Sequence, residues 1–199
     1  MPQILKQEIK ERILASALDS FLENGYRDTS MQQIAQKAGI AAGNIYNYFK
    51  SKELIFSTLA DPVLQEVKAI FKPFAGGLPT INPKSGMDIA EKRMNAFIKV
   101  YQKNRKVFVL LFEKSDATRF ETTRADVIQT MASAVIRLKN ALTPIPATLE
   151  QEVLVKAYVT AYINGIISIL TEAIDEQLKL DALQKFLPFM RSKLVENLR

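Results

Sequence analysis

Apolar residues recur at every third or fourth position along most of the chain, the spacing that places them on one face of an α-helix. The first such pattern covers residues 7–23, and its apolar stripe consists of Ile9, Ile13, Leu14, Ala17, Leu18 and Phe21. Asn24 and Gly25 follow, and glycine readily adopts the left-handed backbone in which many helices end. The pattern predicts a first helix that ends near Gly25.

A second, shorter pattern starts after residue 28. Thr29 and Ser30 are suitable N-caps, and Thr29 with Gln32 has the spacing of a capping box. The apolar face of this helix comprises Ile34, Ala35 and Ala38. Gly39 then predicts a sharp exit from the helix.

A third helix is expected from about Ala41, with Ile45 and Phe49 four residues apart as its buried pair. The residues between them and before them are then free to face outward. Two short helices joined by a glycine turn are the sequence form of a helix-turn-helix, whose second helix enters the DNA major groove. Residues 30–49 are therefore predicted to form such a motif.

Ser51 is a suitable N-cap for a fourth helix, which contains Pro62. Because an interior proline removes a hydrogen bond and clashes with the preceding turn, we expect a kink or break near residues 60–62. It would form a joint between an N-terminal head and the rest of the molecule. Residues 73–87 hold three prolines and three glycines and are the clearest predicted loop.

Helical spacing resumes at residue 88, and Asn104 with Arg105 marks a turn. The apolar run 107–112 could be a strand by itself, but the helical context favours a buried helix. Further helices are expected over residues 123–142, from the N-cap Thr148 to about residue 176, and from the N-cap Asp181 onward, the last interrupted by Pro188. The predicted fold class is all-α.

The chain has 199 residues, with no cysteine and no histidine. It therefore lacks disulfides, the commonest general base and the commonest transition-metal ligand. No paired-carboxylate or glycine-rich phosphate motif stands out, so we expect no catalytic residues, no metal, no cofactor and no enzymatic activity. The charged N-terminus lacks the apolar segment of a signal peptide, and no uninterrupted apolar run reaches the roughly 18 residues of a membrane span. These features favour a cytoplasmic protein without a membrane partner.

The net charge of +6 is unevenly placed. Residues 1–60 hold seven Lys or Arg and six Asp or Glu, a net charge of +1, which leaves +5 for the remainder. A head that binds DNA must therefore use a few positioned groups, doubled by a second subunit, rather than a broad basic patch.

The segment from Ile9 to Leu54 resembles the TetR family of bacterial transcriptional regulators. The shared features are a first helix ending in NGY, a Thr-Ser pair, IA at 34–35, AG at 38–39, and a glycine at 43 before IYNYF and KSKE. The resemblance implies a three-helix DNA-binding domain at residues 1–52 and a helical domain for ligand binding and dimerisation at residues 53–199. It also implies a homodimer whose heads place their third helices in successive major grooves of a palindromic, double-stranded operator.

By this resemblance, Thr29, Ser30, Tyr48 and Lys52 contact phosphates, and helix N-termini, hydroxyls and ammonium groups suit that role. Asn44 and Asn47 are candidates for base contacts, because an amide can pair with adenine N6 and N7. The predicted DNA-binding set is Thr29, Ser30, Ala41, Ala42, Gly43, Asn44, Tyr46, Asn47, Tyr48, Lys50 and Lys52.

Ala41 and Ala42 depart from the family pattern, which often has Ser or Thr and then a polar or basic residue at these positions. The two alanines remove a cap and a charged contact; they could instead meet thymine methyl groups or simply lower the affinity. Residues such as Tyr46 and Phe49 are more often core than contact residues, and Lys50 could equally be a solvated surface charge or a phosphate ligand.

The helix that starts after Thr148 is apolar nearly all round and must be covered on all sides, in part by a second subunit. We therefore expect a homodimer through the last two helices. Large apolar and amphipathic side chains could line a pocket for a small-molecule effector, although plain core packing explains them equally well. The candidates are Met94, Phe97, Tyr101, Phe108, Phe112, Met131, Tyr158, Tyr162 and Asn164.

Together these patterns predict a ligand-responsive repressor, released from its operator by a small apolar or aromatic ligand. The identity of the effector, the operator sequence and the choice between repressor and activator stay open. The alternative is a helical small-molecule carrier or sensor with weakened DNA binding, which the two alanines and the nearly neutral head favour.

Overall fold

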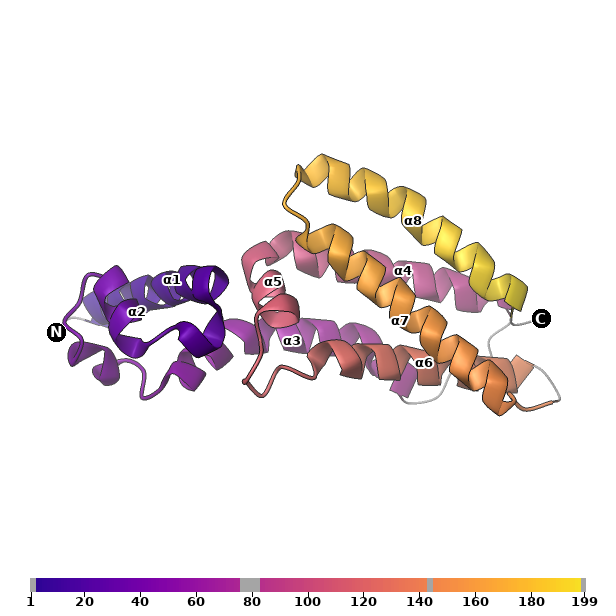
Figure 1. The fold of residues 1–199 in the computed structure, drawn as a ribbon, viewed down its shortest axis with the longest axis horizontal. Coiled ribbons are helices and arrows are strands. Elements are labelled where there is room, and N and C mark those ends of the chain that lie inside the picture. The colour runs from indigo at the N-terminus through magenta and orange to yellow at the C-terminus, as the bar shows by residue number, and fades with distance from the viewer. Residues whose placement is uncertain (1–2, 76–82, 143–144, 198–199) are drawn as a thin grey trace. The chain divides into compact units, whose positions relative to one another are not determined.

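The computed structural model describes residues 3–75, 83–142 and 145–197 and confirms the all-α fold (Figure 1). Its elements are α1 (Gln3–Asp28), α2 (Met31–Lys37), the 3-10 helix η1 (Asn44–Asn47), α3 (Lys52–Ala75), α4 (Pro83–Lys103), α5 (Arg105–Glu113), α6 (Thr123–Leu142), α7 (Leu149–Thr171) and α8 (Glu176–Asn197). The described ranges contain no β-strand, and the apolar run 107–112 lies within α5 as predicted.

Packing divides the chain into two compact units. The first unit comprises Met1–Val67 and Lys99–Thr123, and the second comprises Lys68–Ile98 and Arg124–Arg199. The predicted head thus shares a unit with the first part of α3, with α5 and with the segment that follows α5. The expected domain boundary after residue 52 remains a prediction.

The core of the first unit is built on the apolar stripe of α1, which packs against α2 and α5. The side chains of Ile13, Ala17 and Phe21 on this stripe are completely buried. Gly25 adopts a positive φ of 79° and interrupts the helical backbone, which agrees with the predicted end of the first helix.

The expected third helix is much shorter than predicted. Only Asn44–Asn47 is helical, and it is a 3-10 turn in which the Tyr48 N–H bonds to the Ile45 carbonyl. No side chain caps its start, and Ala41 has no hydroxyl with which to do so. The predicted anchoring pair is confirmed, since Ile45 and Phe49 are 0% and 2% exposed.

Of the kink or break predicted near residues 60–62, the break is wrong, because α3 is one helix from Lys52 to Ala75, and the kink stays a prediction. Pro62 is exposed, whereas Ala60, Val63 and Val67 beside it are buried. Tertiary packing of the apolar face can therefore hold the helix together despite the hydrogen bond that proline removes.

The loop predicted over residues 73–87 is wrong at both ends, since α3 extends to Ala75 and α4 begins at Pro83. Proline suits the first position of a helix, where the N–H has no helical partner anyway. The middle of that predicted loop lies outside the described residues.

In the second unit, α7 and α8 pack side by side (Figure 1). Thr148 caps α7 as predicted, in a capping box with Gln151. However, α7 ends at Thr171 rather than near residue 176, and the prediction that Asp181 caps the last helix is wrong. Asp175 does so instead, since its carboxylate accepts the N–H groups of the next helix at residues 177 and 178. Pro188 lies inside α8 without ending it.

Candidate nucleic-acid interface

The start of α2 is capped by Ser30 and not by Thr29. The Ser30 hydroxyl accepts the Gln33 N–H at 3.2 Å, and the Gln33 side chain accepts the Ser30 N–H at 2.7 Å. The predicted capping box of Thr29 with Gln32 is therefore wrong by one residue. Ser30 is exposed at the N-terminus of α2, and its predicted phosphate contact stays a prediction.

Thr29 has an internal structural role. Its side chain is 2% exposed, and its hydroxyl lies 2.7 Å from the Gly25 carbonyl and 3.1 Å from the Ser20 carbonyl. These bonds tie the chain after the glycine back to α1. The hydroxyl is thus directed away from solvent, which does not favour the predicted phosphate contact.

The exit from α2 is a compact glycine turn. Gly39 has φ +66°, its N–H bonds to the Gln36 carbonyl, and the Ile40 N–H bonds to the Ala35 carbonyl. This is the Schellman arrangement, which glycine permits without steric cost. It turns the chain sharply between α2 and η1.

After this turn, an exposed surface is held on a buried anchor. Ile45 and Phe49 lie in the core, while the intervening and preceding side chains face solvent, including Tyr46 at 48% exposure. The exposed members of the predicted DNA-binding set are Ser30, Ala41, Ala42, Gly43, Asn44, Tyr46, Asn47 and Lys50, and Tyr48 is half-buried. The structure brings the two candidate base-reading residues, Asn44 and Asn47, to opposite ends of η1.

Lys52 is held inside the head. Its Nζ donates to the carbonyls of Tyr26 at 2.5 Å and Thr29 at 2.7 Å, and it lies 4.2 Å from the centre of the Tyr26 ring. Burial lowers the pKa of Lys52, an effect that the nearby Asp28 carboxylate opposes. Its ammonium group already donates hydrogen bonds to backbone carbonyls near the end of α1. Fewer of its donors are therefore available for a phosphate.

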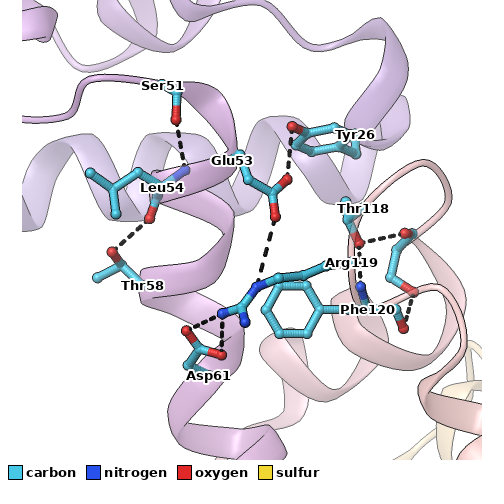
Figure 2. A network of polar contacts seen from close by, with 10 residues as sticks. Tyr26, Ser51, Glu53, Leu54, Thr58, Asp61, Thr118, Arg119 and Phe120 are labelled. Carbon is cyan, nitrogen blue, oxygen red and sulfur yellow. Dashed lines mark hydrogen bonds and ion pairs between the residues drawn. The ribbon is translucent and has the colours of Figure 1, made fainter.

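The segment after α5 is attached to the head by a polar network that no local sequence pattern indicates (Figure 2). Arg119 Nη2 lies 2.6 and 2.5 Å from the two Asp61 carboxylate oxygens, and its Nε lies 3.9 Å from Glu53. Glu53 also accepts the Tyr26 hydroxyl at 3.1 Å. Burial, followed by this hydrogen bond, raises the pKa of Tyr26 to about 12.

An aromatic cluster lies beside this network. The Phe56 ring centroid is 5.4 Å from those of Phe21, Tyr26 and Phe120, and Phe120 is 1% exposed. Phe120 thus completes a core that otherwise comes from α1 and α3. Its distance in sequence from the head explains why no local pattern indicated this role.

The predicted ligand-binding residues are divided between the two units. In the first unit, Phe108 contacts Tyr101 and Phe112 through ring centroids 5.3 and 4.5 Å apart, and all three are buried in an aromatic cluster. The other six, Met94, Phe97, Met131, Tyr158, Tyr162 and Asn164, belong to the second unit. Among the latter, Asn164 Oδ1 is buried without a hydrogen-bond partner in the described part of the chain.

An open depression of about 400 Å³ lies at the turn between α4 and α5. Its lining is Gln102, Lys103, Asn104, Arg105, Lys106 and Val107. None of the predicted ligand-binding residues is among them, and three of the lining residues are cationic.

Comparison with known proteins locates the similarity in the head. The family model described as "Bacterial regulatory proteins, tetR family" matches residues 13–59. The chain is 39% identical over 59 residues to the uncharacterized HTH-type transcriptional regulator YhgD of Bacillus subtilis, covering 30% of this chain and 31% of that protein. It is 37% identical over 65 residues to the HTH-type transcriptional regulator RutR of Escherichia coli, covering 33% and 31%. The chain thus aligns with about a third of the length of these curated relatives.

The similarity of fold extends further than that of sequence. The crystal structure of NalD, the secondary repressor of the MexAB-OprM multidrug efflux pump in Pseudomonas aeruginosa, superposes with a TM-score of 0.53 at 18% identity. This match covers 92% of the chain and 95% of NalD, and at such low identity it shows the fold alone. The head thus carries the sequence signature of the tetR family of bacterial regulatory proteins over residues 13–59, and the chain as a whole shares the all-helical fold of NalD.

Proposed function

We propose that the protein is a ligand-responsive transcriptional repressor that binds a palindromic operator as a homodimer and releases it when a small apolar or aromatic molecule binds the helical C-terminal region. In this proposal it is cytoplasmic and has no enzymatic activity. NalD, which shares its fold, is described as a repressor.

The observation that carries this proposal is the exposed segment 41–47, held in place by the buried Ile45 and Phe49. Asn44 and Asn47 project amides from it, and amides read adenine through paired hydrogen bonds in the major groove. Ser30 at the exposed start of α2, Tyr48 and Lys50 supply the phosphate contacts that orient the head. Because few cations take part, binding requires two heads acting together.

The dimer is proposed to form through α7 and α8. Along α7, Leu149, Val153, Ala157 and Ala161 recur every four residues and are all exposed in the single chain. Leu178 and Phe189 on α8 are also exposed, at 57% and 63%. By length and composition α7 could cross a membrane, as apolar core helices often could, and a helical interface would cover it equally well.

The effector is proposed to bind within the second unit, where Met94, Phe97, Met131, Tyr158 and Tyr162 supply large apolar surfaces. Asn164 would orient the ligand, because its buried amide oxygen can accept a hydrogen bond from it. By linkage, the effector must weaken DNA binding by the same factor as DNA weakens effector binding.

The test is to select duplexes from a random pool with the purified full-length protein and to titrate the selected duplex against a shuffled one. We expect a preference for a two-fold symmetric sequence. Equal affinity for both duplexes at moderate salt would reject the proposal.

The carrier or sensor with weakened DNA binding is a second candidate, favoured by the internal engagement of Thr29 and Lys52 and by the two alanines before η1. Double substitution of Asn44 and Asn47 by alanine distinguishes the two. If the protein is a repressor, the double variant loses its preference for the selected duplex. If it is a carrier or sensor, the weak affinity for DNA is unchanged by the double substitution.

A further inference from the structure

Arg12 connects α1 to the exit of α2, 26 residues further along the chain. Its Nη2 donates to the Ala38 carbonyl at 2.7 Å and its Nε to the same oxygen at 3.3 Å. The Gly39 carbonyl also lies 3.4 Å from Nη2. The guanidinium thus binds both carbonyl groups at the glycine turn.

These carbonyls cannot be satisfied by the helix itself. The turn uses the Gly39 and Ile40 N–H groups to bond to earlier carbonyls, those of Gln36 and Ala35. Beyond this point the backbone has left the helix, so no following turn supplies donors to Ala38 and Gly39. A guanidinium meets this need with several donors, and its charge suits the negative end of the helix dipole.

The position of this contact matters because the exposed segment starts directly after it. Residues 41–43 carry no helix, and η1 has four residues without a side-chain cap. Together with the buried Ile45 and Phe49, the direction in which the chain leaves Gly39 therefore determines where Asn44 and Asn47 lie. The Arg12 side chain holds this exit against α1. Arg12 is followed on α1 by Ile13, whose side chain is completely buried.

We propose that Arg12 is a positioning residue for DNA recognition, which fixes the exit of α2 to α1 and so sets where Asn44 and Asn47 meet the bases. This inference rests on the proposed function. Arg12 is exposed, so the competing role is a direct phosphate contact, and the two roles differ in what they do to specificity and to salt dependence.

The experiment uses the full-length protein with the selected duplex and its shuffled counterpart, each titrated over a range of salt concentrations. The variants are Arg12→Ala and Arg12→Lys. The matched control is Lys6→Ala, which removes another exposed cation from α1. Thermal unfolding of each variant shows that the head is folded at the assay temperature.

We expect Arg12→Ala to lower the affinity for the selected duplex about tenfold, which is about 1.4 kcal/mol. The affinity for the shuffled duplex and the salt slope stay unchanged, because phosphate contacts are kept. Arg12→Lys keeps the charge, but lysine has one nitrogen and cannot donate from two coplanar nitrogens as a guanidinium does. Its affinity for the selected duplex should therefore lie between those of the wild type and Arg12→Ala. Lys6→Ala leaves the ratio of the two affinities unchanged.

Three results would overturn the inference. Equal losses on both duplexes, with a salt slope smaller by about 1.8 because each of the two subunits loses one phosphate contact, would make Arg12 a phosphate ligand. Equal losses with an unchanged slope and a lower unfolding temperature would make its role purely structural. Unchanged affinity for the selected duplex would remove any role. A wild-type protein that does not distinguish the duplexes instead rejects the proposed function itself. If Arg12→Ala does not fold, the same comparison is made with Arg12→Lys.

Discussion

Arg119 and Asp61 lie 58 residues apart in sequence and form a two-bond ion pair within the first unit (Figure 2). The arginine also lies over the Phe120 ring, 4.6 Å from its centre, and Phe120 enters the aromatic cluster of the head. The segment between α5 and α6 is thereby attached to α3 by one charged contact and one apolar contact. The two contacts are expected to differ in strength.

The Arg119–Asp61 pair should contribute modestly to stability. The two side chains are 57% and 40% exposed, so solvent screens their attraction. A double-mutant cycle with Arg119→Ala and Asp61→Ala is expected to give a coupling of about 0.5–1 kcal/mol in urea unfolding. The matched control is the Lys106–Asp19 pair, which has one bond and should couple more weakly. A coupling of zero for Arg119 and Asp61 would show that the contact is incidental.

Burial of the Phe120 ring should contribute much more to stability than the Arg119–Asp61 ion pair. Because its ring is almost completely buried against Phe56, Phe120→Ala should lower the free energy of unfolding by about 3–5 kcal/mol. Leu54→Ala serves as the control, since Leu54 is 45% exposed and its truncation should change stability by about 0.5 kcal/mol or less. Similar losses for both variants would contradict the assignment of Phe120 to the core.

Tyr26 gives stability a dependence on alkaline pH. Its pKa is raised from 10.0 to about 12 in the folded protein, so the folded state holds the phenolic proton more tightly than the unfolded state. The resulting stabilisation is fully present below pH 10 and is lost as the pH rises toward 12. In an absorbance titration of tyrosinate, Tyr26→Phe should remove a component with a midpoint near 12. If the component that disappears has a midpoint near 10, the burial and the Glu53 bond do not perturb Tyr26.

Thr29 should contribute to the stability of the fold and should not contact a DNA phosphate. Thr29→Val keeps the shape but removes the donor to the Gly25 and Ser20 carbonyls, and about 1–2 kcal/mol of stability should be lost. The affinity of the folded variant for the selected and the shuffled duplex should not change. Ser30→Ala, which removes an exposed N-cap, should cost about 1 kcal/mol and is the informative comparison, since Ser30 can also meet phosphate. Equal losses of affinity for the selected and the shuffled duplex in folded Thr29→Val would restore the phosphate role.

Gly165 should be required for close packing of α7 on α8. A Cβ at this position would overlap the Phe186 ring, which stacks on Tyr162 at 6.1 Å. Gly165→Ala is therefore expected to cost about 1–3 kcal/mol, more than the roughly 1 kcal/mol that alanine gains in a helix. Gly43→Ala is the control, because that position has open space and an ordinary helical φ of −69°. Thermal unfolding measures the stability of both variants. If Gly165→Ala were as stable as Gly43→Ala, the predicted clash would be refuted.

Local patterns predicted the helices well where the signal is carried by neighbouring residues. The α1 stripe, the glycine at 39, the cap at Thr148 and the pair Ile45 and Phe49 all depend on spacings of a few residues. The predicted boundaries failed where more than one residue near a helix start can cap it: Ser30 caps α2 instead of Thr29, and Asp175 caps α8 instead of Asp181. They also failed at Pro62, where burial of one helix face outweighs the local cost of proline.

The sequence by itself therefore determined the all-helical class, the head motif and the residues that anchor the exposed segment, because helical periodicity and turn chemistry are local. Only the tertiary structure decided that Arg12 binds the exit of α2, that Lys52 and Thr29 face inward, and that Arg119 and Phe120 belong to the head unit. Apart from the bond of Thr29 to Gly25, which spans four positions, each of these contacts joins residues more than 20 positions apart in the sequence. Their formation depends on how helices pack, and no short spacing in the chain records it.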